Sequence, residues 1–265
     1  MSAKADRSIE SDVTTPLLYA HSQQTLPACT LLILEMLVMT GQWLVGALAL
    51  TVALACAEPA HSQGADELTA LREQVGRLHK QGRYTEAVPT AERYVALARK
   101  LHGEEHTEFA TAIAWMGTVY TAQRRYAEAE PLYKKSLAIR EKALGPDHLS
   151  VGTTLDSLAA LYRAQNRDDA AEPLYVRSLA IDEKQLGMDH PNVSASLNNL
   201  AWLYKDQGRY TEAEPLYKRA LAINVKHFGM DHPKVGHSLN HLADLHRVQG
   251  LYAEAEPLYK RSLGI

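Results

Sequence analysis

The chain of 265 residues contains very little cysteine and phenylalanine, with two residues of each kind. Cys29 and Cys56 both lie in the first quarter of the chain, so neither a disulfide framework nor a cysteine zinc cluster is expected beyond them. The formal net charge is −3, from 28 basic and 31 acidic residues. This near balance gives no reason to expect nucleic acid as a partner.

Sequence signatures of enzymatic chemistry are also missing. The chain has no glycine-rich phosphate loop, no patterned nucleophile and base, and no interleaving of basic and aromatic residues typical of RNA binding. Asp-His pairs begin at Asp147, Asp189 and Asp231, but each lies one repeat further along the chain. Zinc ligands must lie within about 2.3 Å of one ion, so we expect a structural role and no metal or cofactor. In that role the aspartate caps the next helix and the histidine packs or hydrogen-bonds in the loop.

What the sequence does contain is one motif that recurs five times. Its proline returns every 42 residues, at Pro89, Pro131, Pro173, Pro215 and Pro257. A period of about 20–50 residues is typical of stacked supersecondary units, which grow as a linear array without one central core. We place the repeats at residues 66–107, 108–149, 150–191, 192–233 and 234–265, with the last one incomplete.

Each repeat predicts a pair of helices. In the fourth repeat, Leu197, Leu200, Ala201 and Tyr204 have the i, i+3, i+4, i+7 spacing of one helical face. A turn follows at Gly208, where glycine can adopt a positive φ. A second apolar helical pattern follows, with its proline near the first turn, and ends at a glycine suited to cap it.

The motifs LNNLA-LY, GRY-EAEPLYKRAL and LG-DHP-V resemble the tetratricopeptide repeat (TPR). The 42-residue length is similar to the repeats of kinesin light chains and their bacterial relatives, and exceeds the common 34-residue form. The resemblance covers about residues 66–265. It implies an all-α fold, a right-handed α–α superhelical solenoid of about five TPR hairpins.

The positions at which the repeats differ point to a binding surface. Stacked first helices line the inner face of such a superhelix, and in the resembling family an asparagine there holds the backbone of an extended peptide. Asn198 and Asn240 stand at that position, and an amide can both donate to and accept from a peptide backbone. The neighbouring basic residues favour an acidic segment or a carboxylate, and the tryptophan is an aromatic anchor. The predicted groove residues are Asp156, Arg163, Asn198, Trp202, Lys205, Asn240, Asp244 and Arg247. The alternative is an ordinary solvated inner face without a dedicated ligand.

Residues 1–62 differ from the repeats, which we assign to a domain of residues 63–265. The segment Trp43–Ala57 is apolar, and Ala55-Cys56-Ala57 offers a signal-peptide cleavage site. We therefore expect export, to the periplasm or as a secreted protein, with residues 1–35 a mis-assigned start. The alternative is an uncleaved anchor that tethers the protein to a membrane, because the uncharged stretch reaches the ~20 residues of a transmembrane span.

These observations predict a non-catalytic adaptor that holds an extended peptide of a protein partner in its concave groove. Two alternatives stay open. Copies of the chain associate as a homo-oligomeric scaffold through the unfinished fifth repeat, or the repeats are the sensor arm of a longer enzyme of which this chain is a fragment.

Overall fold

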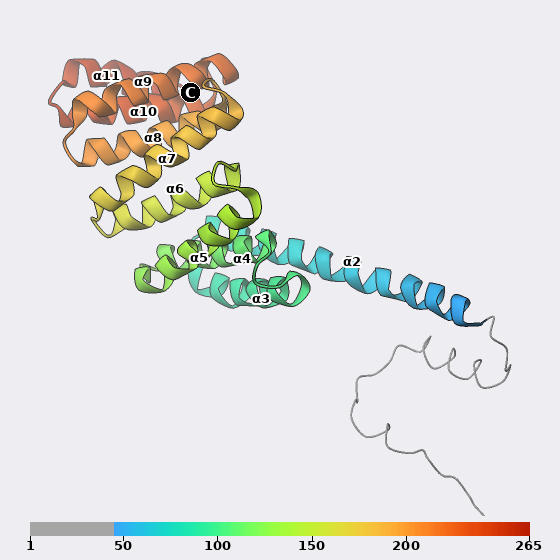
Figure 1. Ribbon diagram of the computed structural model, residues 1–265. Coiled ribbons are helices and arrows are strands. Elements are labelled where there is room, and N and C mark those ends of the chain that lie inside the picture. Colours follow the sequence, from blue (N-terminus) through green and yellow to red (C-terminus); the bar gives the residue numbers. More distant parts are fainter. Residues whose placement is uncertain (1–44) are drawn as a thin grey trace, which may run out of the picture. The chain divides into compact units, whose positions relative to one another are not determined.

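The computed structural model describes the backbone of residues 45–265 and the side chains from Gln63 onward (Figure 1). The residues from Gln63 to Ile265 form one compact unit. Within the described part of the chain, all regular structure is helical. The helices are α2 (Val45–Lys80), α3 (Tyr84–His102), α4 (Thr107–Ala122), α5 (Tyr126–Leu144), α6 (Leu149–Ala164), α7 (Asp168–Leu186), α8 (Pro191–Asp206), α9 (Tyr210–Phe228), α10 (Pro233–Val248) and α11 (Tyr252–Leu263).

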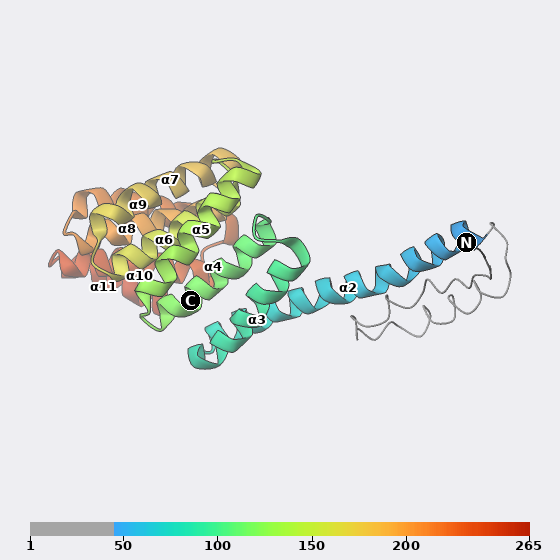
Figure 2. The ribbon, with the colours of Figure 1, turned by 60° about the horizontal axis from the view of Figure 1, so that its bottom comes forward.

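The helices from α3 to α11 stack in chain order (Figures 1 and 2). The even-numbered helices α4, α6, α8 and α10 each pack against the helix that follows and also against the one before. We call these the first helices of their repeats, and the odd-numbered ones the second helices. The expected all-α superhelical solenoid of helical hairpins is confirmed.

Glycines end the second helices, as predicted. Gly103, Gly145, Gly187 and Gly229 follow α3, α5, α7 and α9 with φ between 81° and 87°, a region that disfavours any side chain. Each donates its N–H to a carbonyl of the last helical turn. Within the hairpins, Gly208 has the expected positive φ of 74°. The equivalent turn in the second and third repeats uses the non-glycine residues Arg124 and Asn166, at φ 60° and 56°.

The residue that caps each first helix is a histidine, so the prediction of an aspartate cap is wrong. His106, His148, His190 and His232 precede α4, α6, α8 and α10 in extended conformation. In each case Nδ1 accepts a hydrogen bond from the backbone N–H two residues on, at 3.1–3.2 Å. The cap satisfies one of the N–H groups that a helix start leaves unpaired.

The aspartates of these loops form ion pairs that bridge the loop and the following second helix. Asp147 pairs with Lys184, and Asp189 pairs with Lys226 across a separation of 37 residues. In the second repeat Glu105 and Lys142 make the equivalent pair. Because the partner lies a whole helical hairpin away, the local sequence around the aspartate does not reveal it.

The repeated proline lies deeper in the second helix than predicted. Pro89 is the sixth residue of α3, which begins at Tyr84, and the equivalent prolines lie in the same place in the other second helices. A proline at this depth leaves the carbonyl four residues earlier without its usual helical partner. These helices nonetheless continue past the proline, to His102 in α3.

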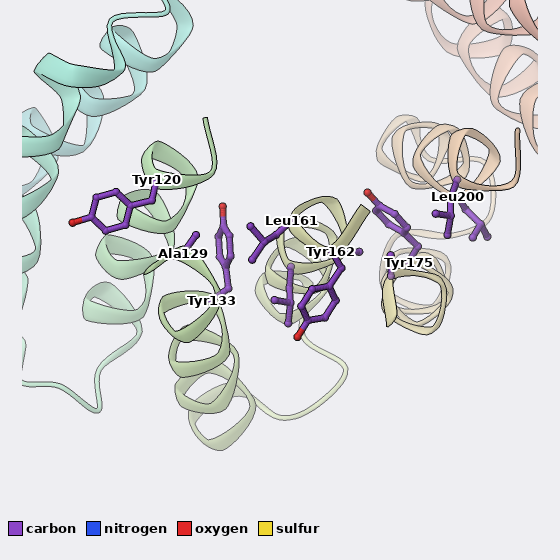
Figure 3. Close-up of a cluster of buried hydrophobic side chains, with 11 residues drawn as sticks. Tyr120, Ala129, Tyr133, Leu161, Tyr162, Tyr175 and Leu200 are labelled. Carbon is purple, nitrogen blue, oxygen red and sulfur yellow. The ribbon is translucent and has the colours of Figure 1, made fainter. Parts of the chain in front are cut away.

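The largest core cluster combines tyrosines, leucines and alanines from three repeats (Figure 3). Tyr133, Tyr175 and Tyr217 occupy equivalent positions of the second helices α5, α7 and α9 and are at most 2% exposed. Gly117 lies against the first of these, since a Cβ added there would meet the Tyr133 ring at 3.0 Å. Equivalent alanines, such as Ala159, are fully buried. The small residue therefore sets how closely the two helices of a repeat approach.

Two neighbouring junctions carry the same three-residue contact. Between the second and third repeats, Glu130 accepts hydrogen bonds from Tyr162 (3.0 Å) and Arg167 (2.8 Å). Between the third and fourth, Glu172 accepts them from Tyr204 (3.1 Å) and Arg209 (2.7 Å). The equivalent positions are Val88 at the first junction, and His246 and Leu251 at the last, so the contact is confined to the middle of the stack.

The predicted leader lies largely outside the described residues. Residues 1–44 are not described, and for residues 45–62 the structure gives only the helical backbone of α2. Among the described helices, none has a stretch long and apolar enough to cross a membrane. The boundary between leader and repeats, the cleavage site and the start of the chain therefore stay predictions.

Candidate functional site

The first helices form one continuous face. The backbone of each of α4, α6 and α8 comes close to that of the next first helix along the stack, which the backbones of successive second helices in the described residues do not. Successive second helices are joined by long side chains, such as Arg177 of α7 with Glu141 of α5. The stack is therefore tighter on the side of the first helices, which places them on the concave side of the curve. All eight predicted groove residues lie on α6, α8 and α10.

Three of these residues meet at one point of the face. The guanidinium carbon of Arg163, on α6, lies 3.9 Å from the centre of the Trp202 ring, on α8. The Nζ of Lys205 lies 5.7 Å from the same ring centre. Both are cation–π contacts, and Trp202 is still 41% exposed. We refer to Arg163, Trp202 and Lys205 as the basic–aromatic cluster.

His241, which no sequence motif singles out, completes this region. The ring of His241, on α10, is stacked on Tyr217 with centroids 5.6 Å apart and lies 6.4 Å from the Trp202 ring centroid. Burial lowers the pKa of His241, and the nearby charge of Lys205 lowers it further. A neutral imidazole therefore lies beside the two cations at neutral pH. Position 241 also varies between repeats, as Trp115 and Asn199 show, so this variation was the available signal.

Asp244 and Arg247 form a separate cluster on α10. The Oδ1 of Asp244 accepts a hydrogen bond from the Tyr259 hydroxyl at 2.5 Å and lies 3.3 Å from Nε of Arg247. Burial alone would raise the pKa of Asp244, but these two hydrogen bonds, together with the positive charges of Lys205 and Arg247, outweigh it and lower the pKa. The positive charge of Arg247 is thus partly neutralised within its own helix.

The remaining predicted residues differ in how accessible they are. Asn240 is exposed, whereas Asn198 and Asp156 are half-buried. The side-chain oxygen of Asn198 and the Oδ1 of Asp156 are buried without a hydrogen-bond partner. Burial raises the pKa of Asp156 to about 7, with Ser178 opposing and Asp182 reinforcing the shift. The face therefore has a free amide at Asn240 and a carboxyl group at Asp156 that burial disfavours in its charged form.

Basic residues are paired differently on the two sides of the solenoid. On the second helices, Lys134, Lys135, Arg177, Lys218, Arg219, Lys260 and Arg261 each lie within ion-pair distance of a carboxylate. On the inner face, Lys205 has no carboxylate partner among the described residues, and Arg163 lies 3.9 Å from Asp206, at the edge of an ion-pair contact. The cations of the basic–aromatic cluster are thus paired less closely with carboxylates than those of the second helices.

The described residues contain no group of three or more His, Cys, Asp or Glu side chains arranged to hold a metal ion. In the Asp-His pairs, the histidines cap helices and the aspartates form ion pairs, as described above.

The fold and its inner face define an α-solenoid of helical hairpins with a basic and aromatic concave surface. Comparison of sequences agrees with this class. A model of the tetratricopeptide repeat matches residues 108–184, 169–226 and 206–265, and a second tetratricopeptide repeat model matches residues 75–108. The chain belongs to the tetratricopeptide repeat family, whose fold is that of a protein–protein interaction scaffold. No protein with a curated description matches the sequence.

Solved structures indicate which type of tetratricopeptide repeat the chain contains. The chain is similar to a Podosopora anserina protein described as having kinesin light chain nearly identical TPR-like repeats, with 29% identity and a TM-score of 0.62. That match covers 74% of this chain and 92% of the other. BtubC (BKLC) from P. vanneervenii has a TM-score of 0.62 at 20% identity, over 77% of this chain and 89% of its own, and supports the fold alone. The resemblance to kinesin-light-chain-like repeats is confirmed.

Proposed function

We propose that this protein is a non-catalytic adaptor that holds an extended segment of a partner protein along its concave face. The observation that carries the proposal is the basic–aromatic cluster, because two cations lie over an exposed tryptophan without a firm carboxylate partner. Such partly buried cations can form charge-assisted hydrogen bonds with an incoming carboxylate, and the tryptophan offers apolar area beside them. A partner segment that contains acidic residues fits this surface best.

The amides of the inner face complete the proposal. Asn240 is exposed, and Asn198 lies one repeat earlier at the equivalent position of α8. An amide both donates and accepts, so the exposed Asn240 fits the main chain of an extended peptide regardless of its sequence. The Oδ1 of Asn198 is buried, so this residue would contribute its N–H donors one repeat earlier. The acidic side chains of the partner peptide would then determine the register in which it lies along the face.

The test is capture of partner proteins from native extract by the full chain. Asn198→Ala combined with Asn240→Ala should weaken capture while the helical melting curve stays nearly unchanged. Arg163→Ala combined with Lys205→Ala should weaken capture of acidic segments in particular. Lys134→Ala combined with Lys135→Ala removes the same charge from the second-helix side and is the matched control.

The captured proteins are identified by mass spectrometry and their acidic segments retested as synthetic peptides. If the inner-face variants and the control bind the same peptides with the same affinity, the concave face is not the binding surface.

A second candidate function is association between copies of the chain through the last hairpin. Apolar side chains are exposed there, since Leu263 is 88% and Tyr252 68% exposed. Exposed apolar side chains favour association. Sedimentation of the full chain should then depend on concentration, and polar substitutions at Leu263 and Tyr252 should abolish this dependence.

The proposal also places the repeats outside the cytoplasm, through export or a membrane tether. It rests on the sequence of residues 1–62 alone. Sequencing the N-terminus of the protein from its native source tests it: a start after Ala57 supports cleavage, and a start at Met1 contradicts both a cleaved leader and a mis-assigned start.

A further inference from the structure

A pocket of about 230 Å³ lies at the first repeat, among α2, α3 and α4. It is distinct from the basic–aromatic cluster, whose residues belong to α6 and α8. Its lining combines the polar residues Arg72, Tyr94 and Glu108 with the apolar residues Ala65 and Leu68. Sites for drug-sized ligands measure about 300–1,000 Å³, so this pocket fits a smaller molecule.

The hydroxyl group of Tyr94 is the unusual feature of this pocket. The side chain is fully buried, in one core cluster with Leu68 and Phe109, yet its hydroxyl has no hydrogen-bond partner of normal geometry. Burial raises the pKa of this hydroxyl, and the nearby carboxylate of Glu108 raises it further. The group therefore stays protonated and can donate a hydrogen bond. Most buried polar groups in proteins do have a partner, so this one calls for an explanation.

The other repeats show that packing alone does not explain the hydroxyl. The equivalent residues of the later repeats are Ser136, Ser178, Ala220 and Ser262. Each serine donates to a backbone carbonyl of the first helix of its own repeat, at 2.8–2.9 Å. Tyr94 instead carries its hydroxyl a ring's length further, to the vicinity of Arg72 and Glu108. The first repeat therefore replaces a paired hydroxyl with an unpaired one beside two charged residues.

Arg72 and Glu108 bring one positive and one negative charge to the same pocket. Neither lies within ion-pair distance of the other, or of another charged residue in the part of the chain that the structure describes. At the next junction along the stack the equivalent residues are Ala114 and Ser150, which carry no charge. A ligand carboxylate can pair with the guanidinium group, and a ligand ammonium group can pair with the carboxylate.

We propose that this pocket binds a free α-amino acid, with the ligand's carboxylate on Arg72 and the Tyr94 hydroxyl and its ammonium group on Glu108. A simple anion would leave Glu108 beside a second negative charge, and a simple cation would face Arg72. A zwitterion pairs with both residues. The apolar surface of Ala65 and Leu68 fits a small apolar side chain, such as that of valine.

Binding includes a small movement of side chains. The Tyr94 hydroxyl is covered by its neighbours, whereas Arg72 and Glu108 are only half-buried. Rotation of these two side chains toward the charges of the ligand uncovers the hydroxyl, and side-chain rotations of this kind are common on binding. The site does not depend on the proposed adaptor function, because it needs no residue of the basic–aromatic cluster.

The first test is isothermal titration calorimetry of the full chain with L-valine and two derivatives that each lack one charge. N-acetyl-L-valine keeps only the carboxylate, like the C-terminus of a peptide, and L-valinamide keeps only the ammonium group, like an N-terminus. L-Valine should bind about tenfold more tightly than either, because each derivative loses one charge-assisted pair. Equal binding of the three compounds would overturn the proposal.

A thermal-shift screen with the common L-amino acids allows for a side chain other than that of valine. At least one of them should raise the melting temperature, and its N-acetyl and amide derivatives then take the place of the valine derivatives in the titration. If no amino acid raises the melting temperature, the pocket is not an amino-acid site.

Substitutions then test whether binding occurs in this pocket. Tyr94→Phe removes only the hydroxyl and should weaken binding about three- to tenfold. Tyr217→Phe is the matched control, because Tyr217 is another buried tyrosine whose hydroxyl lacks a partner, on α9 and outside the pocket. Arg72→Gln and Glu108→Gln should each weaken binding about tenfold or more.

The control variant should bind as the parent does. Equal affinity of the Tyr94→Phe variant, the Tyr217→Phe variant and the parent would contradict the assigned site. None of these measurements involves a partner protein, so the amino-acid site and the adaptor function can fail separately.

Discussion

The guanidinium carbon of Arg163 lies 3.9 Å from the centre of the Trp202 ring, and the two residues belong to first helices of successive repeats. The contact joins α6 to α8 on the concave face and holds the guanidinium over an exposed aromatic ring. Arginine stacks in this way and can still bind a carboxylate through its fork of N–H donors, which lysine cannot imitate.

Arg163→Lys should therefore weaken binding of acidic peptides although the charge is kept. Loss of the stacked geometry and of bidentate hydrogen bonding should lower affinity about three- to tenfold. The measurement is fluorescence anisotropy with a labelled peptide identified by capture. Arg177→Lys, the same substitution on a second helix, should leave the affinity unchanged. An equal loss in both variants would mean that the effect is not specific to the concave face.

Glu172→Ala should lower the melting temperature by about 2–4 °C, after allowance for the partial exposure of the residue. The substitution removes the acceptor of both Tyr204 and Arg209 at the junction of the third and fourth repeats. Glu256 occupies the equivalent position in the fifth repeat, and its ion-pair partner among the described residues is Lys260 of its own helix. Glu256→Ala should leave the melting temperature unchanged, and a similar loss in both variants would contradict a role for the junction.

The same glutamate makes a contribution with a definite pH dependence. The hydrogen bond from Arg209 lowers the pKa of Glu172 below its ordinary value. Its stabilisation is therefore present above the pKa of the unfolded chain, about 4.3, and is lost as the pH falls through the lower folded-state pKa. The difference in melting temperature between parent and Glu172→Ala should shrink below pH 4.

Gly187→Ala should destabilise the protein by about 1–2 kcal/mol. Gly187 has φ 87°, where a Cβ is strained although no neighbouring atom lies within 4 Å of it. Gly152 provides the matched control because it lies inside α6. A Cβ added there would make an ordinary contact, 3.4 Å from Ile181. Gly152→Ala should be neutral or stabilising by up to about 1 kcal/mol. Urea unfolding measures whether each substitution raises or lowers the free energy of unfolding.

Asp156→Asn should stabilise the protein at alkaline pH and have little effect in acid. Burial raises the pKa of Asp156 to about 7, above the value of about 3.9 in an unfolded chain. Between these values the folded protein holds a proton that the unfolded chain does not, so the parent loses stability as the pH rises. Unfolding of both proteins at pH 5 and pH 8.5 measures the difference. An equal effect of the substitution at the two values would show that Asp156 does not titrate as described.

Much of the fold could be predicted from the sequence because its determinants are local and repeated. The spacing of Leu197, Leu200 and Ala201 fixes one buried helical face, and the φ of 87° at Gly187 follows from the need to end a helix. Repetition strengthens each inference, since one pattern is observed five times. The predicted groove residues likewise share the inner-face helices, because a fixed period places equivalent residues in one row.

Contacts between repeats could not be predicted in the same way. Asp147 was expected to cap the nearest helix, but its partner Lys184 lies 37 residues away and leaves the cap to His148. The Asp and the His are adjacent in sequence, so spacing alone could not assign the two roles. The meeting of Arg163 with Trp202 depends on the distance between neighbouring helices, which the hydrophobic pattern does not specify.

The recurrence of the Glu–Tyr–Arg contact has a consequence for how the length of such a protein can change. Glu130 and Glu172 are 42 residues apart and meet equivalent partners in the next repeat. Excision of residues 131–172 would bring Arg209 to Glu130 and recreate the same junction in a shorter stack. Insertion of a unit at this point would duplicate it. Gene duplication or deletion in the middle of the solenoid can thus lengthen or shorten the concave face by whole repeats. No new interface between repeats has to evolve for this.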